Sequence, residues 1–190
     1  MKYTLVMMIL VGLMLPGFAS ADSLQFGVGI TTSLLSYNED EIDESRMFWG
    51  GQARLRVMKY LMGEVSLQKR EDNFNVRGGS IELDTVPLQL SAIFYPLAML
   101  PVSPYLVAGT GWYFLTATVR GDIDLPYVTG TGSIEHTETA FHIGVGAEAF
   151  IGSHFSIGGD VRKVFLDFET AIIRYEFDAY LVNVGATFYF

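Results

Sequence analysis

The chain has 190 residues, enough for one domain, and its net charge of −9 at pH 7 makes nucleic acid an unfavourable partner. It contains no cysteine, which excludes disulfides, thiolate metal sites and a lipid-modified cysteine. Charged residues make up 17% of the chain, against roughly 25% in ordinary soluble domains, while aromatic residues reach 14% and glycine counts 20. Such a composition suits a sheet whose outer face meets something other than water.

The first 21 residues have the pattern of a secretory signal peptide. Lys2 supplies a positive charge, residues 5–15 are apolar, and residues 19–21 form the small-x-small pattern of a cleavage site. The apolar run is shorter than the roughly 20 residues that a membrane-spanning helix needs. We therefore expect cleavage of residues 1–21 and a mature chain of residues 22–190, whose net charge becomes −10 because Lys2 is lost.

Alternation of apolar with small or polar residues predicts strands through the rest of the chain. Segment 139–151 is the clearest, because every second residue from Phe141 to Ile151 is apolar. Pro87 lacks a backbone donor and is expected at a bulge or an unpaired position, and a slip of the alternation near Lys163 suggests a bulge. The eight predicted strands are 24–36, 48–57, 62–70, 81–95, 104–119, 139–151, 155–169 and 180–190.

The connections between these strands mostly alternate between longer and shorter. Transmembrane barrels have short turns on the periplasmic side and longer loops outside, and an even strand count returns both chain ends to one side. The predicted connections are 37–47, 58–61, 71–80, 96–103, 120–138 and 152–154.

The chemistry of the two strand faces indicates which one meets lipid. The polar face carries mostly Gly, Ser, Thr, Gln and Asn, whereas a water-exposed face should be rich in Lys, Glu and Asp. Small neutral residues fit the crowded lumen of a narrow barrel. We predict an all-β fold, a closed antiparallel up-and-down transmembrane β-barrel of about eight strands, with a soluble lipocalin-like barrel as the alternative. Aromatic residues expected in the interfacial girdles are Phe48, Trp49, Tyr95, Tyr105, Trp112, Tyr180 and Phe190.

Four segments resemble the outer-membrane β-barrel family, the small eight-stranded barrels of OmpA, OmpX and OmpW type. They are the strand VPLQLSAIFYP at 86–96, PYLVAGTGWY at 104–113, FHIGVGAEAFI at 141–151 and the aromatic last strand. The resemblance implies a bacterial outer-membrane location among outer-membrane lipid and lipopolysaccharide. It also implies that the last strand is the recognition signal for the barrel assembly machinery, read through Tyr180, Val182, Val184, Phe188 and Phe190.

Six charged residues fall on the predicted inner face. Three are positive and three negative, and unpaired charges in a low-dielectric lumen would be very costly, so we expect them to pair with one another. The first interpretation is a network of salt bridges that fills the lumen; a gate or polar path for a small solute is the alternative, and a catalytic role is the third. The residues are Arg54, Arg56, Glu64, Glu148, Asp160 and Arg162.

No residue pattern predicts catalysis, a cofactor or a metal. His136, His142 and His154 do not have metal-ligand spacing. Lipid A deacylases of the PagL kind also use an eight-stranded barrel, but their His-x-Ser-Asn signature is absent from this chain. We therefore predict that the protein is not an enzyme.

The external loops are the remaining candidates for binding. Loop 37–47 contains five carboxylates within residues 38–44, and hard divalent cations could bridge such carboxylates to lipopolysaccharide. Loop 120–138 is the longest, and loops of this length are often functional. The leading hypothesis is a structural or surface-interaction role, meaning membrane integrity, adhesion or binding through these two loops. The alternatives are a narrow passive channel for small or hydrophobic solutes and, third, a lipid-modifying enzyme.

Overall fold

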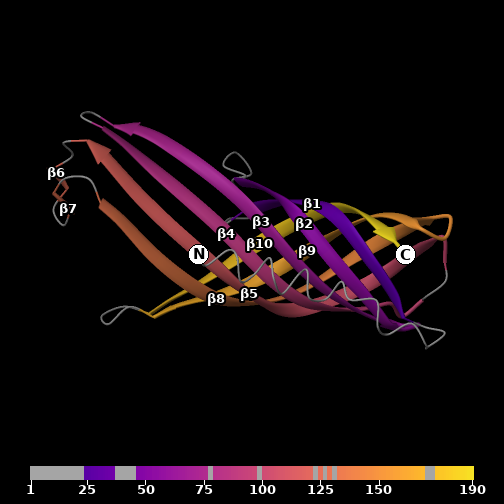
Figure 1. Cartoon of the computed structure of the whole chain (residues 1–190). Helices are drawn as coiled ribbons and strands as arrows, with labels where there is room; N and C mark the ends of the chain where they lie inside the picture. The colour runs from indigo at the N-terminus through magenta and orange to yellow at the C-terminus, as the bar shows by residue number, and fades with distance from the viewer. Residues whose placement is uncertain are drawn as a thin grey trace.

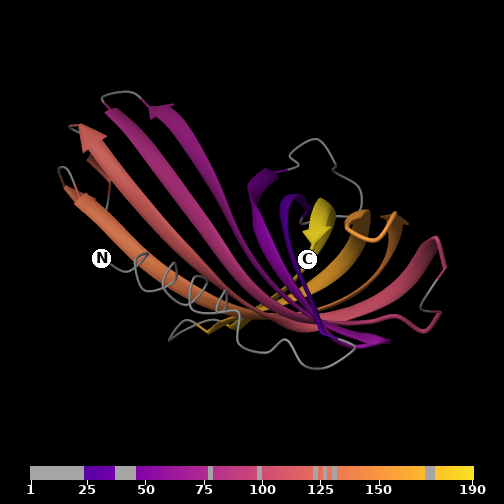
Figure 2. The ribbon, with the colours of Figure 1, turned by 45° about the vertical axis from the view of Figure 1, so that its right-hand side comes forward.

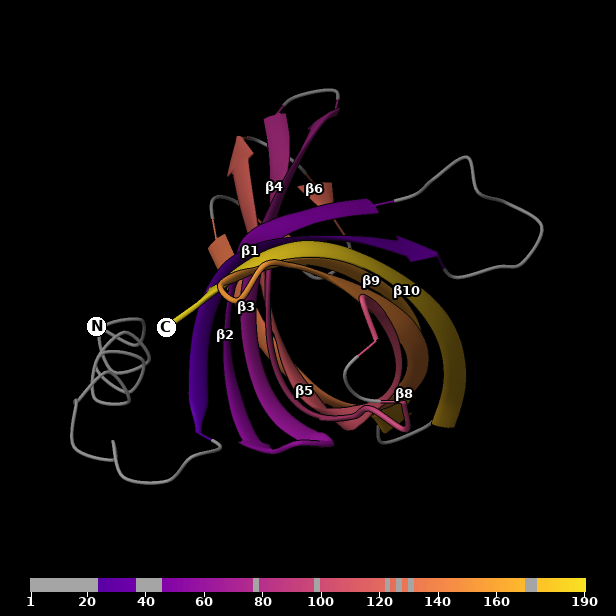
Figure 3. The same ribbon diagram turned by 90° about the vertical axis from the view of Figure 1, so that its right-hand side faces the viewer.

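A computed structural model describes residues 24–36, 46–76, 79–97, 100–121, 124–125, 128–129, 132–169 and 174–190. The expected signal peptide and most of loop 37–47 lie outside these residues. Eight long strands form a closed barrel in the order β1-β10-β9-β8-β5-β4-β3-β2, and each pairs antiparallel with its neighbours (Figures 1 and 3). The predicted fold is therefore confirmed.

The barrel strands are longest in the middle of the chain. They are β1 (Gln25–Ser36), β2 (Arg46–Met58), β3 (Leu61–Val76), β4 (Gly79–Phe94), β5 (Val102–Gly121), β8 (Gly132–Ile151), β9 (Phe155–Glu169) and β10 (Arg174–Tyr189). Two short strands, β6 (Asp124–Leu125) and β7 (Val128–Thr129), form a separate two-stranded sheet between β5 and β8.

The two faces of the barrel strands have the predicted orientation. On β10, Val182, Val184 and Phe188 are exposed on the outside, while Asn183 and Thr187 are buried in the lumen. The other barrel strands follow the same alternation, so a broad apolar belt surrounds an interior whose middle part is polar. This arrangement is the reverse of a soluble protein and matches a barrel that lipid surrounds.

The two ends of the barrel differ. At one end, which we call the turn end, short turns join β2 to β3 and β8 to β9, and the C-terminus lies beside them (Figure 1). Gly152 has a φ of +68° in the second of these turns, a backbone conformation that favours glycine. The Phe190 amide also donates to the Phe26 carbonyl at 2.8 Å, which holds the last residue against β1.

At the other end, four strands continue past their neighbours. The β2–β3 ladder ends at the Trp49–Lys69 pair, and the β8–β9 ladder ends at Ala140–Leu166. Beyond these points β3, β4, β5 and β8 remain paired with one another and form a projecting sheet (Figures 1 and 2). We call it the extension; it comprises residues 70–76, 79–85, 115–121 and 132–136.

The extension corrects two predicted loops. Residues 71–80 belong to β3 and β4 except for a two-residue connection at 77–78, and β5 and β8 occupy much of 120–138. Sequence reading ended these strands where the apolar outer face ends, although the strands themselves continue. In the described residues, these two predicted loops are therefore mostly paired sheet.

Two predicted irregularities have different outcomes. Pro87 pairs with Tyr113 on β5, but the β3–β4 ladder omits the positions of Val86 and Pro87 and resumes in the same register. The expectation of an unpaired position is confirmed there. The bulge expected near Lys163 is wrong, because both ladders of β9 run through this residue without a shift. The slip in the pattern arises because the next residue, Val164, is apolar and faces the lumen.

The predicted girdle residues divide between the two faces. Trp49 and Phe190 are exposed on the outside, and Trp112 and Tyr180 are partly exposed there. Phe48, Tyr95 and Tyr105 are instead buried in the lumen, which corrects their expected place.

Candidate functional site

The lumen is filled in three layers along the barrel axis. The layer at the turn end is largely aromatic and contains Met62, Ile93, Tyr95, Tyr105, Val107 and Tyr189, with Phe150 beside it. The layer nearest the extension is apolar and contains Leu35, Phe48, Tyr113, Ala140, Val164, Ala179 and Leu181. The strands carry polar and charged side chains between these two layers.

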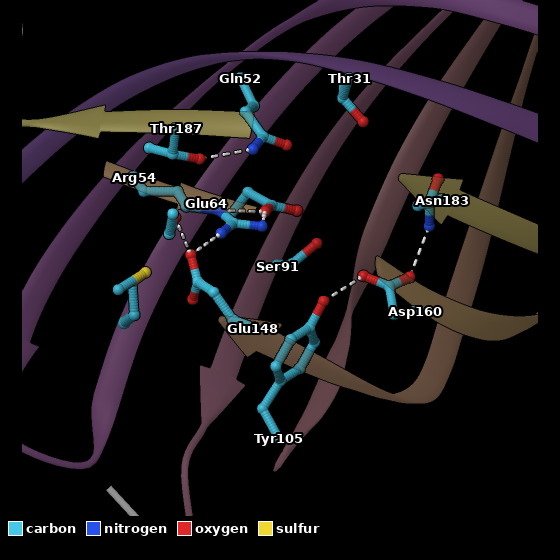
Figure 4. Close-up of polar contacts among 12 residues, drawn as sticks. Thr31, Gln52, Arg54, Glu64, Ser91, Tyr105, Glu148, Asp160, Asn183 and Thr187 are labelled. Carbon is cyan, nitrogen blue, oxygen red and sulfur yellow. Dashed lines mark hydrogen bonds and ion pairs between the residues drawn. The ribbon is translucent and has the colours of Figure 1, made fainter. Parts of the chain in front are cut away.

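The charged residues of the middle layer form one connected cluster. Figure 4 shows four of its members, Arg54, Glu64, Glu148 and Asp160. Glu64 lies at its centre: its Oε2 accepts from Arg54 Nε at 2.8 Å and its Oε1 from Arg162 Nη2 at 2.9 Å. Arg54 Nη1 also reaches Glu148 Oε1 at 2.8 Å, and Arg162 Nε reaches Asp160 Oδ1 at 2.7 Å. The result is a chain of alternating charge, Glu148–Arg54–Glu64–Arg162–Asp160, which we call the lumen cluster.

Two pairs of the lumen cluster connect opposite walls of the barrel. Arg54 and Glu148 lie on β2 and β8, and Glu64 and Arg162 lie on β3 and β9. The two strands of each pair are four places apart in either direction around the eight-stranded ring. Each pair therefore joins the walls across the full width of the lumen, where all four side chains are buried.

The cluster has three carboxylates but only two guanidinium groups. Neighbouring hydroxyl and amide groups donate hydrogen bonds to the carboxylates and so stabilise the excess negative charge. Tyr95, Tyr189 and Ser156 donate to Glu148. Asp160 accepts from the Tyr105 hydroxyl at 2.9 Å and from Asn183 Nδ2 at 2.6 Å (Figure 4). Hydrogen bonds to ionised acceptors are among the stronger ones in proteins, so these donors stabilise the buried carboxylates.

Arg56 does not join the ion pairs of the described residues. Its guanidinium lies over the rings of Phe150 and Tyr189, 5.2 Å and 5.8 Å from their centroids, in the geometry of a cation–π contact. The structure thus brings together five of the six predicted charges and places the sixth on the aromatic layer.

Glycines on the inner face make room for the large side chains. A Cβ on Gly146 would lie 2.5 Å from Tyr105 Cζ and 2.6 Å from Asp160 Cβ. Real contacts of this kind do not come so close, so a small residue is required for the tyrosine and the aspartate to meet. This requirement accounts for glycine at position 146 of β8.

Polar residues that sequence reasoning left out complete the layer. Gln52 donates to Thr187 at 2.8 Å, and Gln68 donates to Ser33 at 2.7 Å. They could have been found from the strand alternation, since each occupies an inward position. A cavity of about 10 Å³ remains among these side chains, room for about one water molecule.

The histidines lie apart from one another. His142 is buried with its Nε2 3.0 Å from Ser91 Oγ, while its Nδ1 has no hydrogen-bond partner in the described part of the chain. His136 contacts Glu138, and both lie on β8. His154 lies in the turn after β8 and stacks on Phe188 of β10. Within the described residues no three acidic or histidine side chains are placed to bind a metal ion.

The residues of the predicted assembly signal lie along the outer face of β10. Val182, Val184 and Phe188 are exposed, Tyr180 is partly exposed, and Phe190 is 69% exposed. The Phe190 ring packs against Phe188 and stacks on Phe26, with centroids 5.3 Å and 6.1 Å away. The last strand thus presents an aromatic cluster at the turn end.

No helix in the described residues has the length and apolarity to cross a membrane. The sequence signature described as "Outer membrane protein beta-barrel domain" matches residues 5–190, nearly the whole chain. The chain belongs to this family. It is therefore an outer-membrane β-barrel protein, surrounded by the lipid of the bacterial outer membrane. No curated protein matches it in sequence.

Solved structures share the barrel at low sequence identity. A major outer membrane protein from Thermus thermophilus is 14% identical, with a TM-score of 0.61 over 88% of this chain and 100% of that one. The N-terminal β-barrel domain of Pseudomonas aeruginosa OprF is 15% identical, with a TM-score of 0.54 over 86% and 97%. Ail of Yersinia pestis, in complex with the heparin analogue sucrose octasulfate, is 15% identical, with a TM-score of 0.53 over 90% and 100%. These similarities establish the fold of the outer-membrane β-barrel.

Proposed function

We propose that this outer-membrane β-barrel is a closed scaffold that holds an interaction surface outside the cell and does not conduct solutes. The observation that carries the proposal is the lumen cluster, whose ion pairs span the full width of the barrel between the aromatic layer of the turn end and the apolar layer nearest the extension. A solute would have to break buried pairs and pass both layers. Separating such a pair leaves both charges uncompensated in a low-dielectric interior, so opening by thermal motion is unfavourable.

The orientation follows from the two ends of the barrel. Short turns are typical of the periplasmic side and longer segments of the outer side, so the extension would project from the cell. Export through a signal peptide at residues 1–21 and assembly through the last strand would bring the barrel to this orientation. A closed barrel with an extension outside the cell favours a protein that stabilises the membrane or binds a partner at the cell surface.

The charge of the outer end favours a positively charged partner. The extension carries five carboxylates and two guanidinium groups, a net charge of −3, and segment 38–44 between β1 and β2 adds five carboxylates. Ail was crystallised with a polysulfated sugar, but sulfate groups would be repelled by this surface. Divalent cations that join its carboxylates to lipopolysaccharide are the complementary small partners.

An enzymatic role is not supported by the geometry of the cluster. Each of its three carboxylates accepts hydrogen bonds from two or more donors in the interior. Carboxylates held in this way stabilise the barrel and are poorly placed to exchange protons with a substrate. We therefore propose a structural role for the cluster.

Conductance across planar bilayers tests the closed lumen. The folded barrel, identified by its heat-dependent shift in gel electrophoresis, is expected to give no discrete current steps, whereas an open porin in the same bilayers does. Arg54→Ala and Glu148→Ala variants that still show the gel shift should also remain silent, because the aromatic and the apolar layers still fill the lumen on either side of the cluster. Discrete conductance of the unmodified protein would overturn the proposal in favour of a channel.

A further inference from the structure

His142 lies at the border between the lumen cluster and the apolar layer. It is 3% exposed, and the register places it beside Gly109 of β5, which in turn lies beside Ser91 of β4. A Cβ on Gly109 would lie 2.7 Å from His142 Nε2, so the imidazole ring occupies the space that a side chain would need there. The ring thereby contacts Ser91 Oγ at 3.0 Å, two strands away from its own.

Ser91 links His142 to the lumen cluster. Arg162 Nη1 donates to the Ser91 hydroxyl at 3.1 Å and also to Gln89 Oε1 at 3.1 Å. An arginine has donors only, so the serine oxygen accepts from Arg162 while the same hydroxyl bonds the histidine. One hydroxyl group therefore connects β9, β4 and β8 at the border of the cluster.

The second ring nitrogen of His142 has no partner. Nδ1 is buried and makes no hydrogen bond to any of the described residues. The nearest side chains on either strand, Val164 of β9 and Ala140 of β8, belong to the apolar layer and carry no acceptor. A neutral ring leaves one neutral atom unpaired there, whereas a ring with two protons buries a charged N–H without an acceptor. The penalty for an unpaired buried group is larger when the group is charged.

The charged and titratable groups around His142 are already engaged with one another. Glu64 and Asp160 pair with Arg162, Glu148 pairs with Arg54, and Glu138 pairs with His136. Within the described part of the chain, no carboxylate bonds the His142 ring, and Arg162 shares Ser91 with it. The strand β4 contributes Ser91 and Gln89, which do not titrate. The groups that face the ring from the other strands are Arg162 and Asp160 of β9, Glu64 of β3, Arg54 of β2, Tyr113 of β5, and Glu138 and Glu148 of β8.

We propose that His142 is an acid-sensitive element of the lumen, whose protonation loosens the packing between the lumen cluster and the apolar layer. A proton taken from water adds a positive charge beside Arg162 and a buried N–H that finds no acceptor. The strain is relieved when the ring leaves Ser91 and the contact between β8, β4 and β9 opens at this level. The inference goes beyond the closed scaffold, because it adds a condition under which the interior changes.

The direction of the effect with pH follows from proton uptake. In the unfolded chain a histidine takes up a proton below about pH 6.5, whereas the barrel must loosen before His142 does so. The unfolded state then binds more protons than the folded state, so stability is fully present above this pH and falls as the pH falls. Between pH 7.5 and pH 5.0 this one group should raise the equilibrium constant of unfolding about thirtyfold.

Unfolding of the chain in lipid vesicles at these two pH values tests the proposal. The variant His142→Gln keeps an amide that can bond Ser91 but cannot take up a proton. We expect acid to raise the unfolding constant of the unmodified chain about thirtyfold more than that of the variant. The carboxylates of the lumen cluster are present in both proteins, so their own response to acid cancels in the comparison. An equal response of the two proteins would overturn the proposal.

His154→Gln is the matched control. His154 is exposed in the turn after β8, outside the lumen, so its replacement should leave the response of the unmodified chain to acid unchanged. If the two histidine variants lost the response equally, the effect would not belong to the lumen and the proposal would fall.

Amide hydrogen exchange of the unmodified chain gives a second readout that needs no variant. After correction for the intrinsic effect of pH on exchange, the amides of Gly109 and Val164 should open more readily at pH 5.0 than at pH 7.5. The amide of Met62 in the aromatic layer should change less. A uniform change along the barrel would contradict a local effect of His142 and overturn the proposal.

The conductance measurement distinguishes this inference from the proposed function. A barrel that conducts at neutral pH but responds to acid through His142 would contradict only the closed lumen. A silent barrel whose acid response is the same with and without His142 would contradict only the acid-sensitive element.

Discussion

Arg54 on β2 and Glu148 on β8 face each other from opposite walls of the barrel and are joined by an ion pair of 2.8 Å across the lumen. Ninety-four residues separate them in the chain. In a barrel whose neighbouring strands are already joined by backbone hydrogen bonds, such a pair adds a connection that the sheet itself cannot make. It fixes the cross-section of the barrel as well as filling it.

Arg54→Ala should destabilise the barrel strongly. Loss of the guanidinium leaves Glu148 and Glu64 buried with fewer donors, and breaking a buried pair in this way costs about 3–5 kcal/mol. Urea unfolding in lipid vesicles, followed by the gel shift, measures the change. The control is Lys69→Ala, which removes a surface pair with Glu71 and should cost less than about 1 kcal/mol; equal losses in the two variants would contradict the assigned role of the lumen cluster.

Replacing both partners should cost less than the sum of the single changes. In Arg54→Met combined with Glu148→Leu, neither charge of this pair is left behind, and Glu64 keeps its bond from Arg162 although it loses Arg54. Apolar side chains of similar volume often replace buried pairs at little cost. The coupling free energy from the double-mutant cycle is expected to be favourable for the native pair. Additive effects would mean that the two residues act independently despite their contact.

Gly146→Ala should disturb the cluster without touching a charge. The added Cβ would meet both Tyr105 and Asp160, and overpacking of a dense interior costs about 1–3 kcal/mol. Gly63→Ala is the matched control, because a Cβ there finds its nearest neighbour 4.0 Å away. Similar unfolding midpoints for the two variants would contradict the close fit inferred at Gly146.

The fold and the orientation of the strand faces could be predicted because lipid requires every second residue, on the outer surface, to be apolar. Segment 139–151 follows that rule at each second position, and so does the last strand. Inward charges could be named from the same alternation. Their partners could not, since Arg54 and Glu148 meet only after the ring has closed, and the order of closure is a property of the whole sheet.

The extension escaped prediction for a physical reason. Ile81 and Leu83 are apolar at odd positions, whereas Leu88 and Leu90 are apolar at even ones. A change of this kind normally indicates the end of a strand or a bulge. Here the register is unbroken, and the outward residues Glu82 and Asp84 indicate that water and not lipid lies outside this part of the strand. Arg56 was expected among the ion pairs and lies instead over Phe150 and Tyr189. Strand alternation predicts which face a side chain is on, but it does not predict which side chain it contacts there.

The boundary between lipid and water can be located on one strand. Ile143 and Thr137 share the outward face of β8, six residues or about 20 Å apart, and both are exposed. Ile143→Arg should destabilise the barrel by about 2–4 kcal/mol, the cost of a cation near the bilayer midplane, and Thr137→Arg by about 0–1 kcal/mol, the cost near an interface. Unfolding in vesicles measures both; equal costs would mean that the bilayer reaches at least to Thr137, directly below the extension.

Phe190→Ala tests the proposed assembly signal separately from stability. Phe190 is 69% exposed at the turn end, where its ring packs on Phe26 and Phe188, so its loss should change refolding into vesicles little. In cells, where the last strand must be recognised, we expect a several-fold drop in heat-modifiable protein in the outer membrane. Phe141→Ala removes an aromatic ring of similar exposure, 65%, from the same lipid-facing surface at β8, and should leave the cellular yield unchanged. If both variants lose yield equally, the effect reports lost apolar surface, and recognition of the last strand must be sought in its other outward residues.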